Sequence, residues 1–152
     1  MSEMVTVERV GRRLGERFWF WSGIPDASPL ALERSALDDG TPWYTINVKG
    51  LAYYEFGHDD GLGGVVQPEA GDRLTLIRQP ENRFDRNAVE VWWRNGVHLG
   101  HVPRYVAAWL APELDAGKAV RAYVVRAGTD AMDAIILGAA VEAHGERSPP
   151  RT

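Results

Sequence analysis

From residue 43 onward, the sequence alternates short apolar runs with turns rich in glycine, proline and asparagine. Asn95-Gly96 separates the apolar runs 88–93 and 97–102, a pattern typical of a tight type I′ hairpin. Further strand-like runs lie at 43–54, 74–77, 119–125 and 134–141. Short strands joined by such turns favour an antiparallel barrel over a parallel α/β sheet. We therefore predict a mainly β fold, a small antiparallel barrel of about six strands.

One flanking helix is predicted after residue 102. Pro103 suits a first helical position, and the apolar residues that follow share one helical face: Val106, Trp109, Leu110 and Leu114. Pro112 is expected to kink or interrupt this helix, because proline cannot donate the main-chain hydrogen bond. Gly117 is expected to end it.

The segment before the barrel has a different character. The aromatic run 17–21 (RFWFW) suggests a buried strand, and residues 28–37 suggest a short helix. The last residues are polar and proline-rich, which is typical of a frayed end. We predict three parts: an N-terminal extension at 1–42 with no assigned role, the barrel at 43–143, and a frayed tail at 144–152.

Composition excludes several classes of protein. The 152 residues contain no cysteine, which rules out disulfide scaffolds, thiolate metal sites and a cysteine nucleophile. No secretory signal or membrane-length apolar run is visible, so we expect a soluble, cytoplasmic protein. The net charge of -4 lacks the basic signature of many nucleic-acid binders. Residues 73–107, however, hold six arginines against three acidic residues, and arginine suits phosphate because its planar fork donates paired hydrogen bonds.

Motifs for catalysis or cofactor binding are missing from the sequence. It has no phosphate-binding loop and no serine nucleophile elbow, so we predict a protein that is not an enzyme and needs no cofactor. His58, Asp59 and Asp60 are interpreted as a polar loop tip. His98 and His101 are three apart on a predicted strand, where side chains alternate, so they are expected to face opposite ways unless a bulge intervenes. No metal site is predicted.

Aromatic residues near the arginines suggest a binding surface. Tyr53 and Tyr54 precede a glycine-rich loop, and Phe84 lies in a turn that offers a large ring little core to join. Exposed rings beside arginines can stack on bases and contact phosphates. Ordinary packing of these rings, with the arginine stems lying along them, is the alternative.

Three segments together resemble the HIRAN domain family. They are 50–54 (GLAYY), 71–89 (GDRLTLIRQPENRFDRNAV) and 99–104 (LGHVPR), and their order and spacing match the family over about 44–125, extending toward 141. The resemblance implies an OB-like barrel with a flanking helix. It also implies binding of single-stranded DNA and capture of a free 3′ end, as in the helicase-linked members.

The resemblance implies a role for each matching residue. Tyr53 and Phe84 would sandwich the terminal base, and Asp85 would accept a hydrogen bond from the 3′-hydroxyl. Tyr54, next to Tyr53, is also predicted as a DNA-binding residue. Asn82 would contact the end nucleotide, and His101 and Arg104 would contact phosphates. Ala52 stands where the helicase-linked members have an arginine. Arg83 and Arg86 would supply the phosphate contact that this arginine makes.

The predicted function is a non-catalytic module that binds single-stranded DNA at 3′ ends in DNA repair or replication-fork processing. Its expected partners are single-stranded DNA and a DNA-processing protein, with no membrane. Two alternatives stay open: a protein-interaction module that uses the same barrel face, and an accessory to a metal-dependent nuclease.

Overall fold

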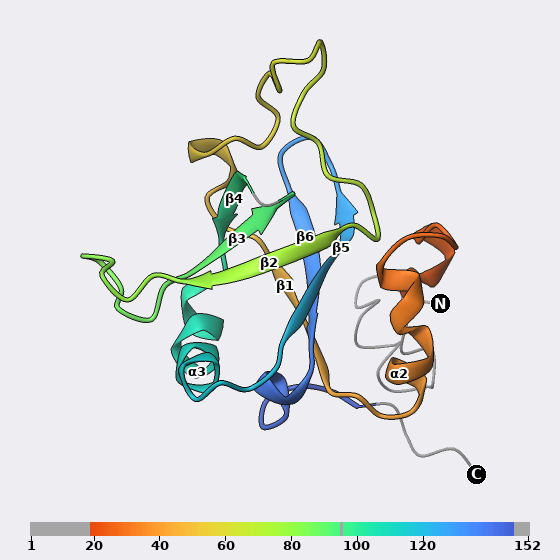
Figure 1. Cartoon of the computed structure of the whole chain (residues 1–152), viewed down its shortest axis with the longest axis vertical. Coiled ribbons are helices and arrows are strands. Elements are labelled where there is room, and N and C mark those ends of the chain that lie inside the picture. The colour runs from red at the N-terminus through yellow and green to blue at the C-terminus, as the bar shows by residue number, and fades with distance from the viewer. Residues whose placement is uncertain (1–18, 95, 148–152) are drawn as a thin grey trace, which may run out of the picture.

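The computed structural model describes residues 19–94 and 96–147, and its centre is a six-stranded antiparallel sheet (Figure 1). The strands are β1 (Trp43–Asn47), β2 (Arg73–Arg78), β3 (Val89–Trp93), β4 (Val97–His101), β5 (Arg121–Ala127) and β6 (Met132–Leu137). They are ordered β1-β6-β5-β2-β3-β4. The α-helices are α2 (Arg34–Asp38) and α3 (Arg104–Asp115), and the 3₁₀ turns are η2 (Trp19–Gly23), η3 (Leu30–Glu33), η4 (Leu51–Tyr53) and η5 (Ala139–Val141). The prediction of a mainly β, antiparallel OB-like barrel is confirmed.

The curled sheet closes through one main-chain contact. Lys49, just after β1, and His101, at the end of β4, each donate a main-chain N–H to the other's carbonyl oxygen at 2.8 Å. A second bridge joins the start of β1 to the C-terminal segment, where Trp43 and Glu146 exchange hydrogen bonds of 2.8 and 2.6 Å. At Gly100 any side chain would collide with the Lys49 carbonyl oxygen. Glycine there permits the close approach that closes the barrel.

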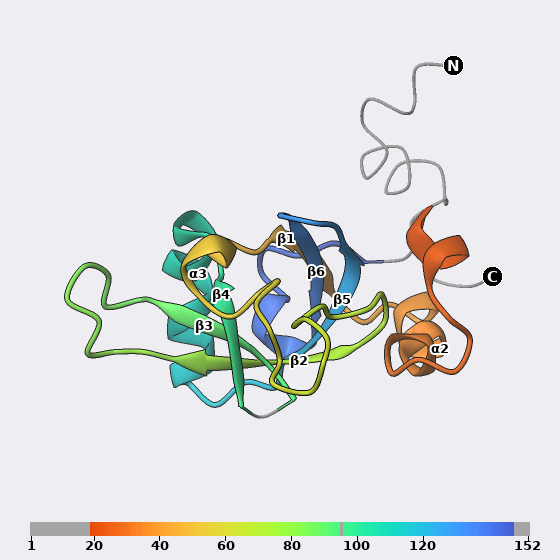
Figure 2. The same ribbon diagram turned by 90° about the horizontal axis from the view of Figure 1, so that it is seen from above.

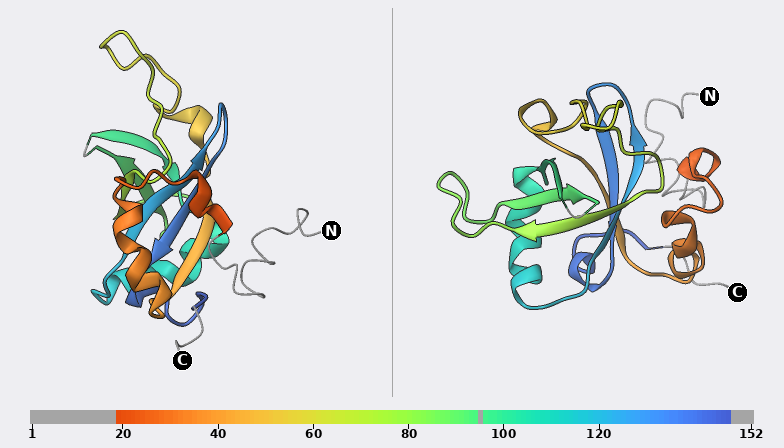
Figure 3. Two further views of the ribbon diagram at one scale, coloured as in Figure 1. Left: turned by 90° about the vertical axis from the view of Figure 1, so that its right-hand side faces the viewer. Right: turned by 45° about the horizontal axis from the view of Figure 1, so that its top comes forward.

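Strands β5 and β6 are buried on both faces. Ala122, Val124 and Ile136 point into the barrel and pack with Val106 and Leu110 of α3. The alternate residues form a second cluster with the N-terminal segment: Tyr123, Val125, Ile135 and Leu137 against Ile24, Leu30 and Leu37. Helix α3 and the N-terminal segment therefore cover opposite sides of the sheet, as Figures 2 and 3 show.

An ion pair also fastens the N-terminal segment to β5. Glu33 accepts hydrogen bonds from Arg121 Nε and from the Tyr123 hydroxyl, both at 2.5 Å. Burial raises the pKa of Tyr123 to about 12, and the hydrogen bond to Glu33 adds to the shift. The extension is thus part of the packed structure from residue 21 to residue 37.

Several local predictions were wrong. Residues 19–21 belong to a 3₁₀ turn and not to a strand; residues 17 and 18 of that predicted strand lie outside the described part of the chain. The strand predicted over 43–54 ends at Asn47, and Gly50, with a left-handed φ of 81°, is the N-cap residue of η4. Helix α3 is not interrupted at Pro112 and runs to Asp115. The strand predicted to reach Val141 ends at Leu137, before the η5 turn.

The β3–β4 hairpin is present, but its turn differs from the predicted one. Trp93 pairs with Val97, so three residues connect the strands. Arg94 has a left-handed φ of 55°, whereas Gly96 does not lie in that region. The type I′ turn predicted for Asn95-Gly96 is therefore wrong at Gly96, and Asn95 lies outside the described residues.

Strand β4 contains a bulge that the sequence prediction allowed but did not locate. His101 faces Glu90 and Gly100 faces Val91, but Trp92 then faces His98, so Leu99 has no partner on β3. The extra residue reverses the alternation of side chains beyond it. His98 and His101 consequently share a face, with ring centroids 5.3 Å apart. The expectation that they face opposite ways was wrong.

Candidate nucleic-acid interface

The loop between β2 and β3, residues 79–88, is held by its own polar side chains. The Asn82 Oδ1 atom accepts hydrogen bonds from the main-chain N–H groups of Phe84 (2.8 Å) and Asp85 (2.9 Å). The Asn82 amide donates to Gln79 Oε1 at 3.0 Å. Asparagine favours turns because its side chain can replace main-chain partners in this way. The loop therefore has a defined conformation although it projects beyond the sheet (Figure 2).

Arg104, the first residue of α3, joins this loop to the helix. Its Nη2 atom donates to the Phe84 carbonyl oxygen at 3.0 Å, and its Nε atom lies 3.7 Å from Asp85 Oδ2. The other Asp85 oxygen accepts the Asn87 N–H at 2.9 Å. Asp85 thus stabilises its own turn with one oxygen and presents the second beside a guanidinium that is largely exposed to solvent.

Tyr53 and Phe84 are two of the most exposed large side chains in the described chain. Tyr53 is 86% exposed at the end of η4, and Phe84 is 83% exposed in the 79–88 loop. Both elements lie on the same side of the molecule as α3, away from the N-terminal segment (Figure 3). Neither ring belongs to a core cluster. Ordinary packing therefore does not account for them.

Tyr54 has a different environment from Tyr53. Its ring is half-buried and lies against His98 and His101, with centroid distances of 4.0 and 5.5 Å. Trp92 stacks on the other side of the cluster, 4.8 Å from His98 and nearly parallel to it. Burial lowers the pKa of His101, and the neighbouring His98 lowers it further. Both effects favour the neutral form of the His101 imidazole.

Arginines surround the loop. Arg83 and Arg86 are exposed and make no hydrogen bond or ion pair with the residues that the structure describes. Arg78, by contrast, is paired with Asp115 at 2.8 Å. The free guanidinium groups of the loop are therefore available to an anionic ligand, whereas Arg78 is engaged in the fold.

The prediction from the sequence did not include two residues of this region, Gln79 and Tyr105. Gln79 Oε1 lies 3.1 Å from His101 Nε2 while it also accepts from Asn82, so it connects the loop to β4. A glutamine inside a turn gives no sequence signal for such a role. Tyr105 is 68% exposed at the start of α3, and its position directly after Arg104 was the available signal.

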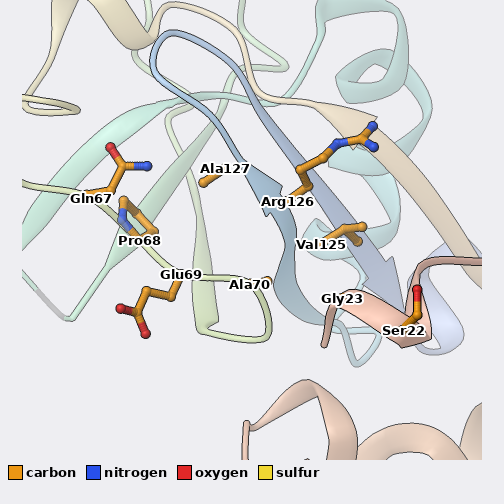
Figure 4. A pocket seen from close by; sticks show the side chains of 9 residues that line it. All are labelled: Ser22, Gly23, Gln67, Pro68, Glu69, Ala70, Val125, Arg126 and Ala127. Atoms are coloured by element: carbon orange, nitrogen blue, oxygen red, sulfur yellow. The ribbon is translucent and has the colours of Figure 1, made fainter. Parts of the chain in front are cut away.

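A hollow lies away from these residues. A cavity of about 500 Å³ opens between η2, the segment before β2 and the end of β5 (Figure 4). Its lining residues are Ser22, Gly23, Gln67, Pro68, Glu69, Ala70, Val125, Arg126 and Ala127. None of the predicted site residues lines this cavity.

No helix in the described chain is both long and apolar enough to cross a membrane.

Comparison with known proteins places the matching region over the barrel. The HIRAN domain profile matches residues 44–138. A curated Arabidopsis thaliana protein, the putative SWI/SNF-related matrix-associated actin-dependent regulator of chromatin subfamily A member 3-like 1, is 36% identical over 69 residues. That match covers 45% of this chain but only 7% of the relative's length.

Two solved structures share the fold. The crystal structure of the HIRAN domain of human HLTF matches with a TM-score of 0.54 and 22% identity, over 73% of this chain and 98% of that one. A Lactobacillus plantarum protein matches with a TM-score of 0.50 and 23% identity, over 64% of this chain and 96% of that one. The barrel described above is therefore an architecture found in both proteins.

Proposed function

The chain belongs to the HIRAN domain family, and from that premise we propose that it is a non-catalytic module that binds single-stranded DNA and prefers a free 3′ end. The observation that carries the proposal is the exposure of two aromatic rings, Tyr53 at 86% and Phe84 at 83%. Stacking of unpaired bases on such rings is a common basis of single-strand binding. A terminal base between them would gain two stacking faces.

Positive charge around Phe84 supports a polyanionic ligand. Arg104 lies at the base of the 79–88 loop, and Arg83 and Arg86 flank Phe84 within it. In this proposal Arg104 and His101 contact phosphates, and the two loop arginines replace the contact that the family arginine would make at Ala52. Tyr54 contributes by holding the histidines, against which its ring lies.

Recognition of the 3′ end is assigned to Asp85 and Asn82. The Asp85 Oδ1 atom caps the turn, which leaves Oδ2 as the acceptor for a terminal hydroxyl. A hydrogen bond to a charged acceptor contributes roughly 1.5–3 kcal/mol. Asn82 fixes the main-chain N–H groups of Phe84 and Asp85, so it positions both the stacking ring and the carboxylate.

The proposal extends to the boundaries and the biological setting. We assign the binding module to residues 43–143, with the extension before it as a cover for the outer face of β5 and β6. A role in DNA repair or replication-fork processing, with a DNA-processing protein as partner, is proposed because the family contains helicase-linked members. The cytoplasmic location expected from the sequence is kept as part of the proposal.

The experiment is a fluorescence anisotropy titration with short labelled oligonucleotides that end in a 3′-hydroxyl or a 3′-phosphate. A 3′-phosphate removes the donor and places negative charge against Asp85. The expected result is about tenfold or greater preference for the hydroxyl, from the energy of one charge-assisted hydrogen bond. Asp85→Asn should abolish most of this preference while keeping an acceptor for Asn87.

A matched variant controls for charge. Asp130→Asn makes the same charge change in the exposed β5–β6 turn and should keep the preference. Equal affinity of the unmodified protein for both ends would overturn end recognition and leave general single-strand binding. Failure to bind any oligonucleotide would overturn DNA binding itself and favour a protein ligand for the same surface.

A further inference from the structure

The bulge at Leu99 gathers three potential metal ligands at one point of the barrel. His98 and His101 share a face of β4, and Glu90 lies opposite His101 on β3. One ligand atom from each of the three side chains lies within 4.8 Å of the other two. All three residues are half-buried. A regular strand would have placed the two imidazoles on opposite sides of the sheet.

Hydrogen bonding determines the tautomer of His101. Asn82 Oδ1 accepts two main-chain N–H groups, so the other atom of that amide is the donor, and Gln79 Oε1 is its acceptor. An oxygen that accepts from Asn82 also accepts from His101 Nε2, 3.1 Å away. The neutral ring therefore carries its proton on Nε2 and its lone pair on Nδ1.

His98 has the same tautomer. Its Nε2 atom lies 3.1 Å from the Gly100 carbonyl oxygen, which can only accept. Among the described residues, neither Nδ1 atom takes part in a hydrogen bond. Histidines that bind metals commonly donate their second ring N–H to a carbonyl in this manner, which orients the ring and raises its basicity.

We propose that Glu90, His98 and His101 bind a divalent first-row transition metal, with Zn²⁺ as the best match. Two imidazoles and one carboxylate are a ligand set that holds zinc with a further position open. Glu90 Oε1 accepts the Trp92 indole N–H at 2.9 Å, which fixes the carboxylate as the hydrogen bonds fix the rings. The site shares His101 with the DNA proposal, but Glu90 and His98 have no contact assigned in that proposal, so variants of these two residues test the metal site separately.

The surroundings suit a metal at neutral pH. Tyr54 and Trp92 pack on His98 from two sides and hold its ring in place. Burial keeps the pKa of His101 below its ordinary value, so the imidazole is in the neutral form that coordinates metals. Metals bind the deprotonated form of a histidine ligand, so acid should weaken binding.

The test is calorimetric titration of the untagged full chain with Zn²⁺ at neutral pH, repeated with Co²⁺ while the visible absorption of the bound ion is followed. We expect one ion per chain. Glu90→Gln keeps an acceptor for Trp92 and removes one ligand, and His98→Gln removes another. Each should weaken Zn²⁺ binding by more than the 10- to 100-fold that loss of an outer-shell partner costs. Gln79→Ala, which removes the acceptor shared by His101 and the Asn82 amide but no metal ligand, should fall within that range.

Histidine 144 offers a matched control. His144 stacks on Trp109 at 4.4 Å and 17°, an arrangement like that of His98 and Trp92, but it lies outside the cluster. His144→Gln should bind Zn²⁺ like the unmodified chain. Thermal melts of each variant verify folding. Absence of saturable Zn²⁺ binding would overturn the proposal. Binding that survives both Glu90→Gln and His98→Gln, or that is lost in His144→Gln, would also overturn it.

Discussion

Replacing Phe84 by alanine is expected to separate DNA binding from folding. The Phe84 side chain is 83% exposed, so about a sixth of it is buried. Full burial of phenylalanine contributes about 1.5–3 kcal/mol, so its removal should lower the free energy of unfolding by roughly 0.5 kcal/mol or less. The loop should persist, because its anchors to residue 84 are main-chain atoms: the N–H bound to Asn82 and the carbonyl bound to Arg104.

The loss of binding should be much larger. One stacking face contributes about 1–3 kcal/mol per base, which corresponds to roughly a 5- to 150-fold rise in Kd. Anisotropy titration with a short single strand measures the Kd, and urea unfolding measures stability. Leu32→Ala is the control, since Leu32 is 82% exposed in η3, on the opposite side of the sheet. Unchanged affinity of Phe84→Ala, or loss of its cooperative unfolding, would refute the reasoning.

Three further outcomes are expected. If two or three phosphates are contacted, the logarithm of affinity for single strands should fall with the logarithm of salt at a slope of about -1.4 to -2, at roughly 0.7 per phosphate; a flat dependence in anisotropy titrations would contradict this. Gly100→Ala should lower the free energy of unfolding by about 1–3 kcal/mol, because the added methyl group would meet the Lys49 carbonyl oxygen. Gly96→Ala is the control, since a methyl group there would meet nothing within 4 Å. Equal urea midpoints for the two variants would contradict the close approach of Gly100 to Lys49. Because the pKa of folded His101 is lowered, the unfolded chain binds its proton first as pH falls below about 6.5. The free energy of unfolding should therefore decrease below that pH, and the decrease should be smaller in His101→Gln. If urea unfolding gives the same pH dependence for this variant and the unmodified protein, the prediction is wrong.

The parts of the fold that could be predicted are those that local pattern determines. The runs 74–77, 88–93 and 97–102 coincide with β2, β3 and β4 to within one residue at each end. These strands could be predicted because apolar runs bounded by turn residues are signals that extend over only a few positions of the sequence. A helix was predicted after residue 102, and α3 begins at Arg104; Pro103, expected at the first helical position, is the N-cap residue before it. The exposure of Phe84 also followed locally, since the turn around it has no apolar neighbours.

The features that could not be predicted depend on distant contacts. The bulge at Leu99 exists together with the Lys49–His101 contact, and the two ends of that contact are 52 positions apart in the sequence. Likewise, β5 and β6 look like ordinary apolar strands, and nothing in them reveals that Leu30 and Leu37 cover one face. Continuation of α3 through Pro112 reflects packing of Leu110 and Ala111 in the core, which outweighs the local penalty of proline.

The contacts that close the barrel also bear on the kind of ligand it can accept. Proteins that recognise extended peptides often add them as a further strand, which requires a row of unpaired main-chain groups at an edge. Here the outer side of β4 is already engaged at His98, whose carbonyl accepts the Glu55 N–H, and at His101 by Lys49, while β1 begins in the pairing with Glu146. A bound peptide would therefore have few unpaired main-chain groups to pair with at these positions of β1 and β4. Recognition is left to side chains on projecting loops, which favours a ligand that supplies rings and charges of its own over one that supplies a backbone.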